Sequence, residues 1–305
     1  MTGADRRSAA GPDIAAEPAL VDAVCAWYLE HRRDLPWRAA GTTAWGVLVS
    51  EVMLQQTPAE RVRPAWTRWL QRWPDPPSLA AASRADVIRA WERLGYPRRA
   101  LRLREAAIAI TTQYGGQVPA SEPELRSLPG VGEYTAAAVA AFAHGRRAVV
   151  LDTNVRRVLA RVIGGRALPG PSLTVAERAR AAAVLPQDPA RAALWSVGAM
   201  ELGAVVCSAR APACQRCPVS AWCAWAALGR PAYAGPTRVA PGFAGTDREV
   251  RGRLLAVLRD RPGPAGTDEL ASVWPDPEQR ARALAGLVAD GLVTMSDAGH
   301  VSLPA

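Results

Sequence analysis

Apolar side chains recur at helical spacing along most of the chain. The first example starts at Leu20, places Val24 and Tyr28 on the same face, and predicts a helix that ends near Asp34, before the breaker Leu35-Pro36-Trp37-Arg38. Further helix-length segments, separated by proline and glycine, lie at about 44–56, 59–73, 84–94, 97–114, 121–127, 133–144, 152–163, 175–185 and 188–205. No strand-like alternation of any length precedes residue 230, so the body is predicted to be all-α.

The pattern changes after residue 228. Residues 229–246 are rich in Pro, Gly and Ala with little periodicity, and are predicted to form a linker. Helical segments follow at about 247–260, 267–273 and 277–290, and then two short apolar segments, 292–295 and 300–303, flank a polar turn. This order predicts a small winged-helix-like module over residues 247–305. At the other end, residues 1–17 are small and polar and are predicted to be disordered.

A chain of 305 residues is long for a single core, so more than one domain is expected. No run approaches the ~18 apolar residues of a membrane span. The first residues carry no hydrophobic export signal, so a cytoplasmic location is expected.

The formal net charge is +9, and all 37 basic residues are arginine. Residues 231–305 hold 8 arginines against 9 acidic residues, so the excess lies in the rest of the chain. A basic body favours a polyanionic partner, although high genomic GC content also produces an arginine bias. Because the chain has no lysine, no lysine amine can act as a nucleophile.

Four of the five cysteines lie close together, as Cys207, Cys214, Cys217 and Cys223, and only Cys25 is remote. Such a cluster, without an export signal, indicates a metal site rather than disulfides. Four thiolates on one loop can hold either zinc or an iron–sulfur cluster. Arg210 and Arg216 lie between these cysteines, where they can meet phosphates.

Two further segments carry candidate chemistry. Leu128-Pro129-Gly130-Val131-Gly132 lies between two helical segments, where glycines let the backbone approach a phosphate at the start of the next helix. Taken by itself, this segment could be any turn between two helices. Glu51 lies in the apolar helical segment Ser50–Thr57, and burial there would favour the protonated carboxyl, whereas a solvated surface charge is the simpler alternative.

The hairpin, Asp152 and the cysteine loop occur in the order seen in helix-hairpin-helix DNA glycosylases. Residues 20–228 resemble the MutY-type adenine glycosylases, most closely at Ser50–Thr57, where endonuclease III-like enzymes lack a matching Glu. The resemblance implies an all-α helix-hairpin-helix glycosylase body over 18–228, with a six-helix lobe at about 40–148 and a cluster lobe of 18–39 with 149–228. It also implies a [4Fe–4S] cluster on the four cysteines, and a monomer that acts on double-stranded DNA containing an adenine mispair.

By this resemblance, Glu51 is the acid that protonates adenine, as glycosidases pair an acid with a second carboxylate. Asp152 is that second carboxylate, acting as an electrostatic stabiliser or a transient nucleophile, and Asn154 supports the pair. Tyr134 stands where bifunctional relatives have their catalytic lysine, so base removal without strand cleavage is expected. The residues that match the family's wedge into DNA are Gln55, Gln56 and Tyr96; a half-buried core aromatic is the alternative for Tyr96.

The chain departs from the family pattern in three places. Pro97 replaces a second tyrosine after the wedge, Val197 replaces a frequent Gln or Glu, and residues 229–305, which follow the cysteine loop, do not resemble the family's Nudix-like domain. The predicted function is hydrolytic excision of adenine opposite 8-oxoguanine or guanine, with weaker discrimination than in Nudix-bearing relatives. One alternative is a thymine-mismatch glycosylase, against which Gln55-Gln56 argues. Another is a non-catalytic iron–sulfur DNA-binding regulator, against which Glu51 and Asp152 argue. The C-terminal module either packs on the body or contacts DNA through an arginine patch on its first helix: Arg248, Arg251 and Arg253.

Overall fold

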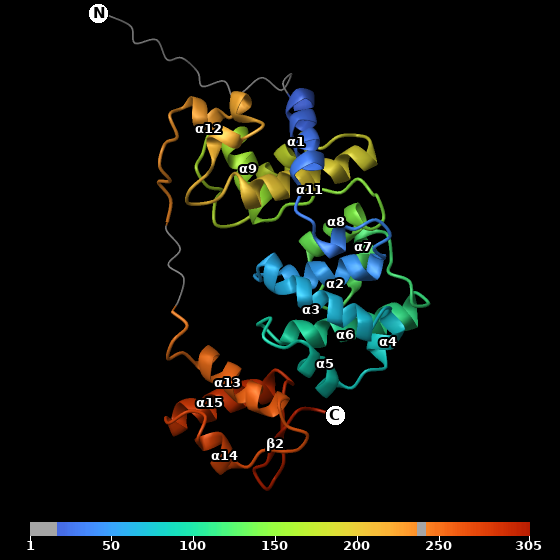
Figure 1. Cartoon of the computed structure of the whole chain (residues 1–305), viewed down its shortest axis with the longest axis vertical. Helices are drawn as coiled ribbons and strands as arrows, with labels where there is room; N and C mark the ends of the chain where they lie inside the picture. Colours follow the sequence, from blue (N-terminus) through green and yellow to red (C-terminus); the bar gives the residue numbers. More distant parts are fainter. Residues whose placement is uncertain (1–16, 237–241) are drawn as a thin grey trace, which may run out of the picture. The chain divides into compact units, whose positions relative to one another are not determined.

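The computed structural model describes residues 17–236 and 242–305, so the predicted disorder of residues 1–16 and part of the predicted linker lie outside the described residues (Figure 1). The described chain is helical, and the only sheet in it has two strands. The helices before the linker are α1 Glu17–His31, η2 Pro36–Arg38, α2 Ala44–Leu54, α3 Ala59–Arg72, α4 Pro76–Ala80, α5 Arg84–Ala90, α6 Arg98–Gln113, α7 Glu122–Ser127, α8 Glu133–Phe142, α9 Thr153–Val162, α10 Val175–Val184, α11 Pro189–Val205, η3 Cys214–Arg216, η4 Ser220–Trp222 and α12 Ala224–Ala227. The predicted all-α body is confirmed.

Some boundaries differ from the prediction for local reasons. Helix α1 ends at His31 rather than near Asp34, because the Arg33 amide donates to the Glu201 carboxylate at 3.1 Å instead of to a carbonyl of the helix. Pro36 then holds Leu35 in an extended conformation. Helix α5 ends at Ala90, because Glu92 and Gly95 turn the chain through the left-handed region, at φ 46° and 79°. The one-turn helices α4 and α12 were not predicted, since they are too short to show a hydrophobic period.

The described residues divide into two compact units. The first contains residues 17–34 and 137–236, and the second contains residues 35–136 and 242–305. In the first unit, α11 packs between α1 and α9 around a core that includes Val24, Val158 and Leu202 (Figure 1). The helices approach closely at Gly203, where a Cβ atom would lie 2.7 Å from Cβ of Asn154.

Helices α2 to α6 form the body of the second unit. Three buried tryptophans pack edge to face there, with ring centres 4.6 Å apart for Trp69 and Trp73 and 5.5 Å apart for Trp69 and Trp91. Such pairs stabilise beyond the apolar area that they bury. Helix α2 is buried along nearly its whole length, so polar groups on it lie inside protein rather than on a solvated face.

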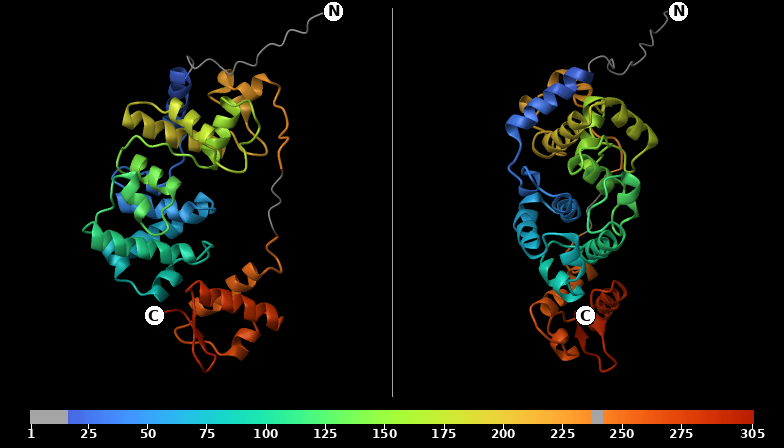
Figure 2. Two further views of the ribbon diagram at one scale, coloured as in Figure 1. Left: turned by 180° about the vertical axis from the view of Figure 1, so that it is seen from behind. Right: turned by 90° about the vertical axis from the view of Figure 1, so that its right-hand side faces the viewer.

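The C-terminal module of the second unit consists of α13 Asp247–Arg259, α14 Thr267–Ala271, α15 Pro277–Ala289 and the antiparallel strands β1 Thr294–Met295 and β2 Val301–Ser302 (orange to red in Figure 2). The elements follow the predicted order, and the winged-helix class stays a prediction. The module shares a core with Ile88 and Leu101 of α5 and α6. Arg259 also donates to the carbonyl of Ile88 at 3.0 Å, so the module packs on this part of the body.

Candidate active site and cysteine cavity

Glu51 is a buried carboxyl group, only 6% exposed, in the middle of α2. Thr43 caps the start of this helix by accepting a hydrogen bond from the amide of Gly46 at 3.1 Å. The hydroxyl of Tyr134, at the start of α8, donates to Oε2 of Glu51 at 2.9 Å. The solvated-charge alternative for Glu51 is therefore wrong, and the fold brings two predicted site residues into contact.

The wedge candidates lie in two loops that one arginine joins. The Arg99 guanidinium donates to the carbonyls of Gln55 at 2.6 Å and Gly95 at 3.0 Å, and to the hydroxyl of Thr57 at 3.2 Å. Burial lowers the pKa of Arg99 to about 10, so it stays charged at neutral pH. Arg99 was not predicted from the sequence. The feature that could have indicated it is its position three residues after Tyr96.

The side chains of these loops differ in exposure. Tyr96 has φ 47° and is 41% exposed, so the core-aromatic alternative is wrong. Gln56 has φ 55° and is exposed, whereas Gln55 is partly buried and donates from Nε2 to the hydroxyl of Thr135 at 3.4 Å. Tyr96 and Gln56 are therefore the side chains available to enter a DNA duplex.

The hairpin 128–132 joins α7 to α8. Leu128 and Val131 are buried, at 2% and 7% exposed, so this loop offers its backbone rather than those side chains to a ligand. Gly130 has φ 77°, and a Cβ there would lie 2.7 Å from Cβ of Arg102. At Gly132 a Cβ would meet nothing within 4 Å, so open space surrounds the backbone at the start of α8. That is where a helix N-terminus attracts phosphate.

Asp152 caps helix α9 in the first unit. Its Oδ1 accepts from the amide of Val155 and its Oδ2 from Nδ2 of Asn154, both at 2.6 Å. Burial raises the pKa of Asp152, and the hydrogen bonds and the nearby Arg157 charge oppose that rise. Asn154 therefore contacts Asp152, one member of the Glu51–Asp152 pair that it was predicted to support, and that role stays a prediction.

Arg157 continues this network to the cysteine loop. It donates from Nη2 to Oδ1 of Asn154 at 2.7 Å and to the carbonyl of Gly203 at 2.6 Å, and from Nε to the carbonyl of Cys207 at 2.8 Å. A continuous series of hydrogen bonds thus runs from Asp152 to the first cysteine. Sequence reasoning missed Arg157, although it lies one helical turn after Asn154, on the same face of α9.

The four cysteines of the loop line one cavity, between α9 and the chain after α11. The buried Arg161 lines it too, donating from Nη1 to Sγ of Cys207 at 3.2 Å, and its guanidinium lies 4.6 Å from the ring centre of Trp225. Arg210 and Arg216 on the same loop are exposed.

The donor set of this cavity is purely sulfur and suits a soft metal centre. In residues 17–236 and 242–305, no three His, Cys, Asp or Glu side chains are grouped so that they could hold a single metal ion. A [4Fe–4S] cube takes one thiolate at each of four separate irons, so thiols spread around a cavity fit it. A buried arginine beside the first thiol fits an anionic thiolate centre.

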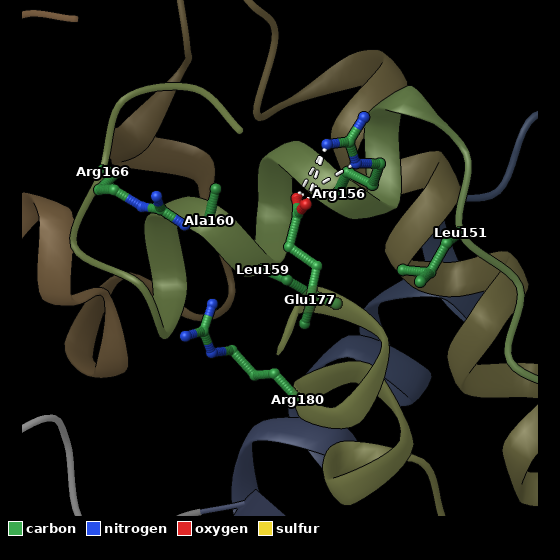
Figure 3. A pocket seen from close by; sticks show the side chains of 7 residues that line it. All are labelled: Leu151, Arg156, Leu159, Ala160, Arg166, Glu177 and Arg180. Atoms are coloured by element: carbon green, nitrogen blue, oxygen red, sulfur yellow. Dashed lines mark hydrogen bonds and ion pairs between the residues drawn. The ribbon is translucent and has the colours of Figure 1, made fainter. Parts of the chain in front are cut away.

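A second pocket of the first unit, beside α9 and α10, is structural (Figure 3). Its volume is about 10 Å³, room for one water and not for a base. Arg156 Nη2 and Glu177 Oε1 form an ion pair of 2.9 Å inside it. Glu177 also closes the capping box of α10 with Thr174, so the ion pair connects α9 to the start of α10.

The sequence of the chain matches a known class of DNA repair proteins. The family model of the HhH-GPD superfamily base excision DNA repair protein matches residues 49–182. The adenine DNA glycosylase of Mycobacterium tuberculosis is 51% identical over 280 residues, which cover 92% of this chain and 91% of the relative. The chain therefore belongs to the MutY-type adenine DNA glycosylases of the HhH-GPD superfamily, and it acts in base excision repair.

Solved structures show the same fold. A thermostable thymine-DNA glycosylase matches with a TM-score of 0.63 and 27% identity, covering 70% of this chain and 98% of that one. A non-covalent endonuclease III–DNA complex matches with a TM-score of 0.61 and 21% identity, covering 71% and 98%. The predicted helix-hairpin-helix glycosylase fold is confirmed. Within residues 17–236 and 242–305, no helix is both long and apolar enough to span a bilayer.

Proposed function

We propose that this glycosylase hydrolyses the N-glycosidic bond of adenine opposite 8-oxoguanine or guanine and leaves the DNA strand intact. The observation that carries the proposal is the buried Glu51 carboxyl with Tyr134 hydrogen-bonded to it at 2.9 Å. A buried carboxyl group on an apolar helix is a suitable proton donor for a poor leaving group.

In this mechanism Glu51 gives its proton to a ring nitrogen of the flipped adenine. The bond between the sugar C1′ and the base nitrogen then breaks, and its electron pair leaves with the base. Positive charge develops on the sugar, water adds to C1′, and a proton from that water returns to the Glu51 carboxylate. Tyr134 donates to Oε2 throughout, which orients the carboxyl and stabilises the charge left after proton transfer.

We assign Asp152 to the developing sugar cation, as a stabiliser or a transient nucleophile. Its hydrogen bonds from Val155 and Asn154 favour the ionised form that this role needs. Tyr134 at the lysine position, in a chain without lysine, cannot form an imine. This supports hydrolysis without lyase activity.

The proposed DNA contacts come from both units. Tyr96 and Gln56 enter the duplex beside the flipped base, and Gln55 supports them from the end of α2. The hairpin Leu128–Gly132 binds phosphate through its backbone, and the exposed Arg210 and Arg216 meet phosphates near the cysteine loop. We further propose that the protein acts as a monomer, with the glycosylase body, linker and C-terminal module divided as the sequence predicts.

We propose that Cys207, Cys214, Cys217 and Cys223 hold a [4Fe–4S] cluster. When bound, the cluster would cross-link the loop after α11 and supply a redox-active centre. Arg161 would donate to the thiolate of Cys207, and Arg157 would connect the loop backbone to Asn154.

A panel of duplexes tests the substrate assignment. Each duplex carries adenine, thymine or uracil opposite either guanine or 8-oxoguanine. The release of free base is measured under single-turnover conditions. We expect only adenine to be released, opposite both partners. Release of thymine opposite guanine would instead identify a thymine-mismatch glycosylase, and binding without release of any base would identify a regulator.

A further inference from the structure

Arg248, near the start of α13, has aromatic neighbours in place of a polar partner. Its guanidinium carbon lies 4.5 Å from the ring centre of Tyr96 and 5.8 Å from that of Phe243. The other arginines of residues 242–305 are paired with oxygen atoms: Arg251 with Asp290, Arg253 with Glu249, Arg261 with Glu269, Arg282 with Asp247, Arg259 with the carbonyl of Ile88 and Arg280 with that of Trp274. Of the arginines in those residues, Arg248 alone has no oxygen partner, and its printed neighbours are the two rings.

The residues around Arg248 leave its positive charge available to an anionic ligand. Its acidic neighbours in sequence, Asp247 and Glu249, face Arg282 and Arg253. Arg248 itself is exposed, and so are the two rings that it contacts, with Tyr96 41% and Phe243 55% exposed. A guanidinium that lies against a ring keeps its N–H groups for an acceptor and loses fewer rotamers on binding, which suits a phosphate.

The position of Arg248 is set by contacts that hold the module against α5 and α6. Arg84 donates to the carbonyl of Gly291 at 3.1 Å, Arg98 pairs with Asp290 at 3.1 Å, and the core shared with Ile88 anchors α13. On the other side, Arg99 fixes the loop that carries Tyr96. Two parts of the chain far apart in sequence therefore place an unpaired cation beside the candidate wedge residue.

We infer that Arg248 is a DNA-binding residue and contacts a phosphate of the duplex next to Tyr96. The inference rests on the proposed role of Tyr96 as a wedge. It gives the C-terminal module a second role besides packing: although residues 231–305 are net negative, they contribute one cation to the mispair-binding surface at the wedge. The module then belongs to the DNA interface.

The test compares Arg248→Ala with Arg253→Ala, a matched control. Arg253 is an exposed arginine of the same helix and also lies against a ring, that of Trp274 at 5.1 Å, but it is paired with Glu249. Binding is measured over a range of salt concentrations with a duplex that carries a non-cleavable abasic-site analogue opposite 8-oxoguanine or guanine. Thermal unfolding of each variant verifies that it folds.

We expect Arg248→Ala to weaken binding to both duplexes by about fivefold to tenfold, and to reduce the slope of log K against log salt by about 0.9, the value for one phosphate. Arg253→Ala should match the wild type, and Arg248→Lys should restore the slope. In a Tyr96→Ala background, the loss from Arg248→Ala should shrink. Equal binding by the two alanine variants would overturn the inference, as would a loss confined to one opposite base with no change in slope.

Because the analogue is not cleaved, this measurement is independent of catalysis. Absence of adenine release by the wild type would refute the proposed function and leave the binding result intact. Unaltered binding by Arg248→Ala, with normal adenine release by the wild type, would refute only the inference.

Discussion

The hydroxyl of Tyr134 donates to Oε2 of Glu51 at 2.9 Å, across 83 positions of sequence. The residue at the superfamily's lysine position therefore contacts the proposed acid directly. In the proposed mechanism, this contact orients the acid, and Tyr134 takes no covalent part in the reaction.

Replacing Glu51 tests its role as the acid. Glu51→Gln keeps the shape and removes the proton, so single-turnover adenine release should fall by at least ~10²-fold, as is typical when a general acid is lost. Binding to mispaired DNA should remain. A near-normal rate for Glu51→Gln would show that the acid lies elsewhere.

Tyr134→Phe removes one hydrogen bond to a charged group, worth ~1.5–3 kcal/mol, so it should slow adenine release by about tenfold or more.

The pH dependence of the rate tests the role of Asp152. Burial raises its pKa, and the carboxylate must be ionised to stabilise the sugar cation, so the rate should fall as the pH drops through this raised pKa. Asn154→Ala removes a hydrogen bond that lowers this pKa, and the acid limb should move to higher pH. Thr153→Ala, an exposed neighbour, is the control and should leave the limb in place. An unchanged acid limb in Asn154→Ala would contradict the assignment.

The raised pKa of Asp152 also predicts how this group affects stability: the ionised carboxylate that the reaction needs lowers the stability of the fold. Because the folded-state pKa of Asp152 lies above its unfolded value, protonation stabilises the fold at low pH, and this stabilisation is lost as the pH rises through the folded-state pKa. At neutral pH the ionised group therefore destabilises the protein. Asp152→Asn should raise the unfolding temperature at pH 7 while abolishing adenine release. A lower unfolding temperature would show that the carboxylate is structurally required.

Arg157 is expected to couple Asp152 and Asn154 to the cysteine loop. Arg157→Lys cannot reach Asn154, Gly203 and Cys207 together, and each buried acceptor left unsatisfied costs ~1–3 kcal/mol. Iron content should fall, and adenine release per iron-loaded molecule should also decrease. Arg156→Lys is the control: it weakens the ion pair with Glu177 and should lower stability without changing the normalised rate. Equal normalised rates for both variants would assign Arg157 a purely structural role.

The metal assignment is tested by composition. Protein purified without oxygen should be yellow-brown and carry about four irons, as a four-thiolate [4Fe–4S] centre requires. Cys214→Ser should lose that iron. Cys25→Ser should keep it, because Cys25 lies in the core of the first unit and does not line the cavity of the four cysteines. One zinc and no iron in the wild-type protein would overturn the cluster.

Patterns and motifs were sufficient to predict most of the fold and the proposed site. The periodicity predicted the long helices, and motif order pointed to Glu51, Asp152 and the four cysteines. Contacts made by side chains far apart in sequence were not predictable in the same way. Arg99 and Arg157 act mainly through carbonyl groups, which every residue has, so their spacing from Tyr96 and Asn154 is only a weak signal. Likewise, Arg248 and Arg253 look equivalent in the sequence, and only the folded module separates the paired arginine from the unpaired one.

Hydrolytic excision of adenine is the central claim, and measuring both products in one reaction tests it most directly. The wild-type protein is incubated in excess over a duplex with adenine opposite 8-oxoguanine, and free adenine and strand breaks are measured in the same samples, with borohydride added to a parallel set. We predict stoichiometric adenine release, strand breaks only after alkali, and no covalent adduct with DNA, because the chain has no lysine amine. Strand cleavage that keeps pace with base release, or an absence of free adenine, would contradict the account.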